Sequence, residues 1–146
     1  MTIVQAAPAD LETLAGLFDA YRVFYERVSD PDAARNYLHD RLTRDEATVF
    51  LALQENEALG FALCYCTFSS VALKPLVILN DLYTTPEARG RGVATALIAR
   101  CADFARSHGA EILRLRTARD NRSAQAVYER VGFVRDEVFF TYDLKL

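Results

Sequence analysis

The sequence predicts an α/β fold with one mixed, mostly antiparallel sheet of about seven strands, flanked by four helices. Stretches with apolar residues every three or four positions alternate with short β-rich runs. Short polar turns between β-rich runs favour antiparallel hairpins, whereas a helix between two runs favours a parallel crossover. The 146 residues have the length of one domain and contain no internal repeat or linker. We therefore expect a single domain over residues 1–146.

The N-terminal half should contribute a strand, two helices and three more strands. Pro8 follows the first β-rich run and stops it. Asp30 followed by Pro31 is typical of a helix start, because Asp caps the free amides and Pro fits the first turn. The polar turn Glu55-Asn56-Glu57 joins two β-rich runs into a hairpin. These six elements are expected at residues 2–6, 10–25, 31–42, 48–54, 59–68 and 77–84.

The C-terminal half should alternate helices and strands. An apolar stripe begins after Gly92 and stops at Gly109, and glycine is favoured just past a helix end. A shorter helix from Asn121 to Val131 is closed by Gly132. Three strands are expected at residues 112–117, 134–138 and 140–145. The complete order is β-α-α-β-β-β-α-β-α-β-β.

Composition excludes several classes of protein. Hydrophobic residues make up 51% and charged residues 25%, which indicates a globular rather than a disordered chain. The net charge of -3 disfavours a nucleic-acid-binding protein, since such domains carry a broad basic surface. No apolar run approaches the length of a membrane span, and the N-terminus lacks the features of a secretory signal, so we expect a cytoplasmic protein. The 3 cysteines do not form a disulfide framework, and no Cys or His cluster suggests a metal site.

The most informative segment is a basic, glycine-bearing turn that leads from the strand at 77–84 into a helix. Backbone amides in the first turn of a helix lack intrahelical partners and carry partial positive charge, so they can hold a diphosphate. Small residues in this turn would let phosphates approach the backbone. The alternative is an ordinary strand-to-helix turn with solvated arginines. The residues expected to bind the diphosphate are Arg89, Gly90, Arg91, Gly92, Val93, Ala94 and Thr95.

Two motifs carry a resemblance to a known family. The pattern Arg89-x-x-Gly92-x-Ala94 resembles the Q/R-x-x-G-x-G/A diphosphate motif of the GNAT family of N-acetyltransferases. Downstream, Asn121-x-x-Ala124-x-x-x-Tyr128-x-x-x-Gly132-Phe133 resembles the second motif of that family, one helix and one strand away. The order of elements also matches the family fold, so the resemblance covers nearly the whole chain. It implies acetyl-CoA as cosubstrate and a family habit of forming homodimers.

The resemblance also implies how acetyl-CoA binds. The strand end at Leu82, Tyr83 and Thr84 would pair its backbone with the pantetheine arm. A bulge in this strand and the splaying of the strand at 112–117 would open a slot for the cosubstrate, because a bulge leaves backbone groups unpaired. Asn121 would contact the cosubstrate from the other wall. Arg119 or Arg122 would reach the 3′-phosphate, or would simply be solvated at the start of a helix.

Acetyl transfer to an amine needs a neutral amine, a stabilised carbonyl oxygen and a proton for the departing thiolate. Tyr128 matches the general-acid tyrosine of the family; the alternative is a core tyrosine at helical spacing. A backbone amide near Leu82 or Tyr83 is expected to stabilise the oxygen. Asp81 is the strand carboxylate near the slot and is the candidate base through water. Its alternative role is to hydrogen-bond nearby backbone, and the transfer does not require a dedicated base.

The acceptor site is expected at the first two helices. Tyr21, Phe24 and Tyr25 make that region aromatic, and Asp81 would suit a cationic amine. A small amine, such as a polyamine or an amino acid, is the first candidate acceptor. A protein lysine or N-terminus is the second, and a non-catalytic sensor that binds acyl-CoA is the alternative to an enzyme.

Overall fold

A five-stranded mixed sheet with strand order β1-β2-β3-β4-β5 organises the first 116 residues. The computed structural model describes all 146 residues and divides into two compact units, Met1–Arg116 and Thr117–Leu146. The first unit contains β1 (Thr2–Gln5), α1 (Leu11–Phe24), α2 (Pro31–Thr43), β2 (Thr48–Gln54), β3 (Glu57–Ser69), β4 (Lys74–Thr84), α3 (Val93–Ser107) and β5 (Leu113–Arg114), with short 3-10 helices η1 (Pro8–Asp10) and η2 (Pro86–Ala88).

The first four strands pair antiparallel with their neighbours, and only β5 runs parallel to β4. This confirms the mixed, mostly antiparallel sheet. The hairpin connections and the helical crossover of α3 produce the pairing directions expected from the sequence.

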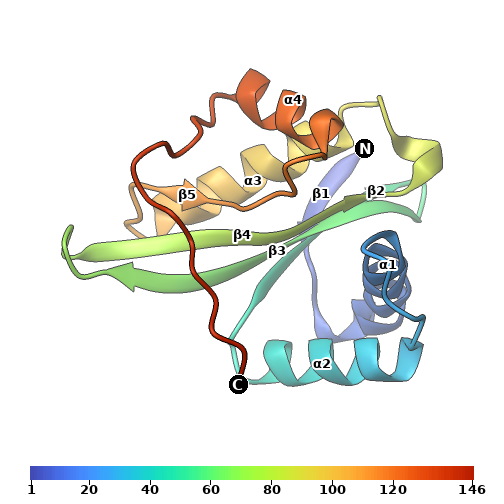
Figure 1. Cartoon of the computed structure of the whole chain (residues 1–146). Coiled ribbons are helices and arrows are strands. Elements are labelled where there is room, and N and C mark those ends of the chain that lie inside the picture. The colour runs from blue at the N-terminus through green and yellow to red at the C-terminus, as the bar shows by residue number, and fades with distance from the viewer. The chain divides into compact units, whose positions relative to one another are not determined.

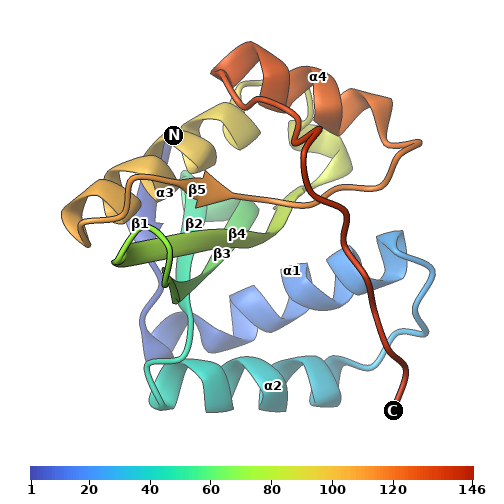
Figure 2. The same ribbon diagram turned by 60° about the vertical axis from the view of Figure 1, so that its left-hand side comes forward.

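Helices cover both faces of this sheet, with α1 and α2 on one face and α3 on the other (Figure 1, Figure 2). The amphipathic stripe of α1 places Leu14 and Phe18 against Leu51 and Leu63 from the sheet. The alternate residues of β2 point the other way, and Phe50 meets Phe104 of α3 with ring centroids 5.6 Å apart. None of the four α-helices combines the length and apolar character that a membrane span requires.

A β-bulge in β4 changes the direction of its side chains. Leu63 of β3 lies opposite Asp81, but the next residue, Cys64, lies opposite Leu79, so Asn80 is the extra residue. Because Leu63 and Cys64 point to opposite faces, Leu79 and Asp81 do so too, although they are two residues apart. The bulge therefore turns Asp81 toward the face that α1 covers.

The parallel pairing between β4 and β5 is short. It joins Val77 and Ile78 to Leu113 and Arg114, and β4 then continues to Thr84 with no strand on that side. The expected strand at 112–117 is thus only two residues long, and its pairing with β4 ends at Arg114. An early end to this pairing leaves a stretch of β4 backbone unpaired by any strand.

The second unit contains α4 (Arg122–Val131) and an extended C-terminal segment. Asn121 caps α4, since its Oδ1 accepts the Ala124 amide at 3.3 Å, and Gly132 ends the helix with φ of 107°. The strands expected at 134–138 and 140–145 are absent, so the prediction of about seven strands was wrong. Asp136 Oδ1 accepts the amides of Val138 and Phe139 at 2.8 and 3.1 Å, and this local turn competes with a strand ladder.

Candidate functional site

The N-terminus of α3 presents uncapped backbone amides. Gly92 is the N-cap residue and makes no side-chain cap, whereas Asp30 caps α2 through the Ala33 amide at 3.0 Å. Gly90 and Gly92 have φ of 76° and 81°, which glycine adopts without the steric cost that other residues bear. A Cβ at either glycine would meet no atom within 4 Å, so open space lies beside this turn. The arrangement fits the diphosphate of a nucleotide cosubstrate.

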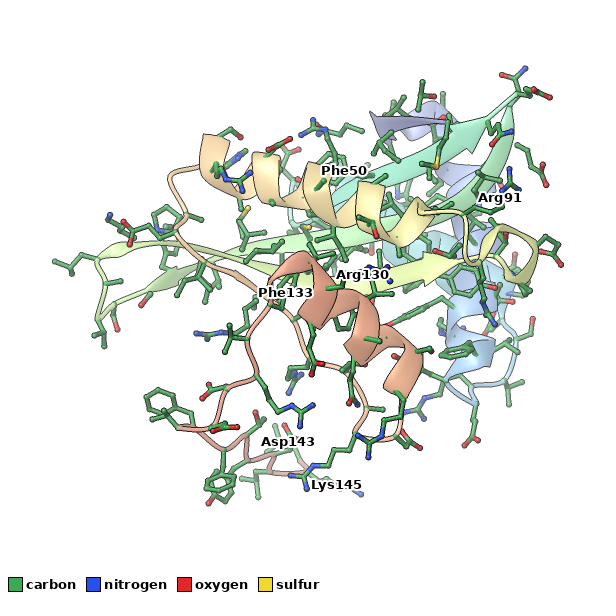
Figure 3. The ribbon with its side chains drawn as sticks, turned by 90° about the horizontal axis from the view of Figure 1, so that it is seen from above. Phe50, Arg91, Arg130, Phe133, Asp143 and Lys145 are labelled. Atoms are coloured by element: carbon green, nitrogen blue, oxygen red, sulfur yellow. The ribbon has the colours of Figure 1, made fainter.

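Two arginines flank the same turn. The Arg91 Nη2 donates to Gln54 Oε1 at 2.9 Å, at the end of β2 (Figure 3). The Arg89 guanidinium lies 5.7 Å from the ring centroid of Phe24, at the end of α1. Both partners are neutral, so both arginines keep their positive charge near the uncapped amides. The turn therefore has the electrostatic character of an anion site.

The unpaired stretch of β4 contains Leu82, Tyr83 and Thr84, the residues expected to pair with a pantetheine arm. Backbone groups of this stretch that face the β5 side have no strand partner. A linear amide such as pantetheine can occupy such an edge by hydrogen bonding as a strand would. The bulge inferred from the family resemblance is present, and the pairing of β4 with β5 ends after two residue pairs.

Asp81 is a nearly buried carboxyl, with 6% of its surface exposed. Asn80 Nδ2 donates to Asp81 Oδ1 at 3.0 Å, and the Tyr21 hydroxyl donates a second hydrogen bond. Burial raises the pKa of Asp81 above its ordinary value, although the two hydrogen bonds oppose the rise. Both hydrogen bonds of the Asp81 carboxyl come from side chains, whereas the alternative role expected from the sequence was a hydrogen bond to nearby backbone. A carboxyl with a raised pKa binds a proton more readily than an ordinary one, which suits a general base.

The aromatic residues predicted at the acceptor site gather beside Asp81. The ring centroid of Tyr21 lies 5.0 Å from Tyr25, 5.9 Å from Phe61 and 6.3 Å from Tyr83. Phe24 packs against Tyr25 at 5.3 Å, and both side chains are partly exposed at the end of α1. Tyr21 thus connects the carboxyl of β4 to an aromatic surface on α1.

Two features of this region were missed in the sequence. The hydroxyls of Tyr37 and Tyr65 are 2.5 Å apart, and burial, this bond and the nearby charge of Asp81 raise the pKa of Tyr65. The alternation of side chains along β3 could have placed Tyr65 on the same face as Leu63. No sequence pattern, however, marks Tyr37 of α2 as its partner. Gly60 lies opposite Thr84, and a Cβ there would approach the Tyr83 carbonyl oxygen to 2.3 Å. Gly60 therefore sets how closely β3 approaches the functional end of β4.

Tyr128 and Asn121 belong to the second unit. Tyr128 is half-buried on α4, with its ring centroid 5.9 Å from that of Phe133. The Oδ1 of Asn121 is used in capping α4 and also accepts the Ser123 hydroxyl at 3.2 Å. Its Nδ2 remains available as a donor. In the second predicted motif, Asn121 and Gly132 therefore cap the two ends of α4, and Tyr128 lies on the helix between them.

Comparisons with known proteins identify the family. Residues 14–133 match the acetyltransferase (GNAT) family. An uncharacterized N-acetyltransferase, YhfO of Bacillus subtilis, is 39% identical over 146 residues, covering 100% of this chain and 98% of that protein.

Solved structures agree with this match. The crystal structure of a probable acetyltransferase matches with a TM-score of 0.94 at 43% identity, over 100% of this chain and 98% of that one. An aminoglycoside N-acetyltransferase in complex with CoA matches with a TM-score of 0.83 at 26% identity, over 99% of this chain and 95% of that one. The chain therefore belongs to the acetyltransferase (GNAT) family and is an N-acetyltransferase whose acetyl donor is acetyl-CoA.

Proposed function

We propose that the protein, acting in the cytoplasm as a homodimer, transfers the acetyl group of acetyl-CoA to a primary amine of a small molecule such as a polyamine or an amino acid. The amine attacks directly while both substrates are bound. The observation that carries this proposal is the nearly buried carboxyl of Asp81, held by Tyr21 and Asn80 beside the unpaired edge of β4. The three free cysteines are in keeping with a reducing compartment.

The donor site is assigned to the N-terminus of α3 and the edge of β4. The amides of Val93, Ala94 and Thr95, with the charges of Arg89 and Arg91, hold the diphosphate. The open conformation at Gly90 and Gly92 keeps side chains out of its way. The backbone of Leu82 to Thr84 holds the pantetheine arm, and the family resemblance assigns Asn121 a contact with the cosubstrate. Bound acetyl-CoA supplies a thioester, whose acetyl group the amine accepts.

The chain contributes three proton-handling or charge-stabilising groups. Asp81 accepts the proton of the acceptor ammonium, directly or through water, and its raised pKa favours this role. The backbone amide of Leu82 or Tyr83 donates to the carbonyl oxygen as negative charge develops on it. Tyr128 donates its hydroxyl proton to the departing sulfur, because a phenol of pKa near 10 and a thiol of pKa near 8.5 are closely matched.

The surroundings of Asp81 favour a slender, cationic acceptor. Only 6% of Asp81 is exposed, so a bulky group could not reach its carboxylate. Tyr21 bonds to Asp81, and the rings of Tyr25 and Tyr83 lie 5.0 and 6.3 Å from the ring of Tyr21; aromatic faces attract an ammonium group. A primary amine on a flexible chain meets both conditions, and this is why a small molecule is preferred over a folded protein surface.

An amine panel tests the proposal. Purified protein is mixed with acetyl-CoA and a pool of polyamines, amino acids and lysine peptides, and thiol release and acetylated products are measured by absorbance and mass spectrometry. We expect release with a small amine and a decrease of about 100-fold in kcat for Tyr128→Phe, with the Kd for acetyl-CoA unchanged. Tight acetyl-CoA binding without thiol release for any amine would refute catalysis and leave a sensor of acyl-CoA.

A further inference from the structure

Asp19 is the second nearly buried carboxyl of the protein, and no step of the proposed acetyl transfer uses it. Like Asp81, it exposes little of its surface, only 8%. Asp19 lies on α1, but its two shortest hydrogen bonds come from the connection between α1 and α2. Ser29 Oγ donates to its Oδ2 at 2.6 Å, and the Asp30 amide donates to its Oδ1 at 2.8 Å. These bonds hold the pKa of Asp19 below its ordinary value, so the carboxyl is ionised at neutral pH.

The connection, residues 25–30, has few other contacts that fix its course. Each of its residues is exposed, so burial of apolar surface does not hold it in place. The other hydrogen bonds of its backbone stay within the last turn of α1 or the first turn of α2. Glu26 has φ of 59°, a left-handed conformation that residues other than glycine adopt rarely. Because such a conformation persists only where the surroundings impose it, the bonds to Asp19 determine where the connection lies.

The connection continues directly from the aromatic surface on α1. Tyr25 is its first residue, and the ring centroid of Tyr25 lies 5.0 Å from that of Tyr21, whose hydroxyl bonds to Asp81. α1 and α2 lie side by side on one face of the sheet, and the connection joins them (Figure 1, Figure 2). The anchor on Ser29 and Asp30 therefore fixes the far end of the segment that starts at Tyr25.

We propose that Asp19 is a positioning residue for the acceptor: by holding Ser29 and Asp30, it keeps the connection in the conformation that completes the acceptor site beside Tyr25. The proposal rests on the proposed function, because it requires the amine to bind at the end of α1. Asp19 acts through the connection and not on the reacting atoms. When only a fraction of the molecules has the binding-competent conformation, the apparent affinity falls by that fraction, whereas the chemistry of the bound complex stays the same. Loss of the anchor should therefore raise the KM for the amine and leave kcat unchanged.

Three variants test the anchor by thiol release, with the amine of the panel that has the highest kcat/KM. Asp19→Ala removes both hydrogen bonds and should raise the KM for this amine about 10-fold, since bonds to a charged group shift an equilibrium by about that factor or more. Ser29→Ala removes one bond and should raise the KM about 3-fold. Asp19→Asn can accept the Asp30 amide at Oδ1 and donate from Nδ2 to the Ser29 hydroxyl, so it should recover most of the affinity that Asp19→Ala loses.

Glu12→Ala is the matched control. Glu12 also lies on α1 and pairs with Arg35 of α2, but in the first turn of α1, at the opposite end from Tyr25. Its loss removes a contact between the same two helices without freeing the connection, so KM and kcat should both stay at their wild-type values. The Kd for acetyl-CoA, measured by calorimetry, should be unchanged in all four variants. Circular dichroism checks that each variant is folded.

Hydrogen exchange of the Asp30 amide gives a readout that does not depend on acetyl transfer. This amide should exchange about 10-fold faster in Asp19→Ala than in wild type or Glu12→Ala. An Asp30 amide that stays protected in Asp19→Ala would overturn the anchor. Faster exchange with an unchanged KM, or a fall in kcat in place of a rise in KM, would overturn the role in positioning. If wild type releases no thiol with any amine, the proposed function fails, and this assignment fails with it.

Discussion

Gly60 offers a direct test of how the β3–β4 pair shapes the site. A Cβ at Gly60 would lie 2.3 Å from the carbonyl oxygen of Tyr83, and real Cβ atoms essentially never approach closer than 3.0 Å. The shortfall is 0.7 Å, and the obstructing atom belongs to the backbone, so no side-chain rotation can relieve it. Gly60→Ala must therefore push the end of β4 away from β3.

The expected effects follow from that displacement. Overpacking of this kind costs about 1–3 kcal/mol, which lowers the Tm of a chain of this length by roughly 3–10 °C. Tyr83 belongs to the strand end proposed to hold the thioester, and a displacement of nearly 1 Å at a reacting centre reduces kcat/KM by about 10–100-fold. Calorimetry and thiol release measure the two effects separately.

Gly16→Ala is the matched control. Gly16 is exposed on α1, and a Cβ there would meet nothing within 4 Å. The same substitution should therefore stabilise the protein by about 0.5–1 kcal/mol and leave kcat/KM unchanged. A Gly60→Ala protein with the Tm and kcat/KM of wild type would show that the close approach of the two strands has no role.

Three further substitutions test the carboxyl of Asp81 and the turn before α3, which contains Arg89 and Gly92. Asp81→Asn should abolish most turnover near neutral pH while raising stability at pH 7 by about 1 kcal/mol, because a buried ionised carboxylate is removed. Since the folded pKa of Asp81 is raised, wild type should gain stability as the pH falls through that raised pKa toward about 3.9, and denaturation of Asp81→Asn should lack this gain. Gly92→Ala should lose about 1–2 kcal/mol in thermal unfolding, entirely from its φ of 81° since the site is open. Arg89→Ala should raise the Kd for acetyl-CoA about 10-fold by calorimetry, with little change in Tm.

Each of these expectations has a contrary outcome. A pH profile of kcat/KM for Asp81→Asn that equals that of wild type would exclude Asp81 as the base. An unchanged Tm for Gly92→Ala would mean that the turn relaxes at no cost. If Arg89→Ala leaves the Kd for acetyl-CoA unchanged, backbone amides alone bind the diphosphate. Arg91→Ala should then also leave this Kd unchanged.

Local patterns predicted the helices and the glycine-bearing turn before α3 well. The stripe after Gly92 and the stop at Gly109 gave α3 within two residues, because capping and periodicity are properties of nearby positions. Asp30 likewise marked the start of α2, where its side chain caps the helix. Features of this kind depend on a few consecutive residues, and the sequence contains them in full.

Features that depend on pairing partners were harder to predict. Alternation of apolar residues predicted strands at 134–138 and 140–145, but a strand forms only with a pairing partner, which alternation does not identify. The importance of Gly60 depends on its register with Thr84, and the Tyr37–Tyr65 contact joins α2 to β3 across 28 positions. The bulge at Asn80 was expected only from the family resemblance, since no local pattern in β4 marks it. Contacts between distant segments are set by packing, which one sequence read alone does not specify.

The extra residue at position 80 decides which face of the sheet carries Asp81. In a regular strand, residues two apart point to the same face, so without the bulge Asp81 would share the face of Leu79 and point toward α3. Because Asn80 is the extra residue, Asp81 instead lies opposite Leu63 and points toward α1, where Tyr21 bonds to it. Deleting Asn80 would make Leu79 and Asp81 adjacent, and adjacent residues of a regular strand also point to opposite faces. Homologous chains without the extra residue should therefore keep this carboxyl facing α1 but lack the unpaired backbone groups of the bulge.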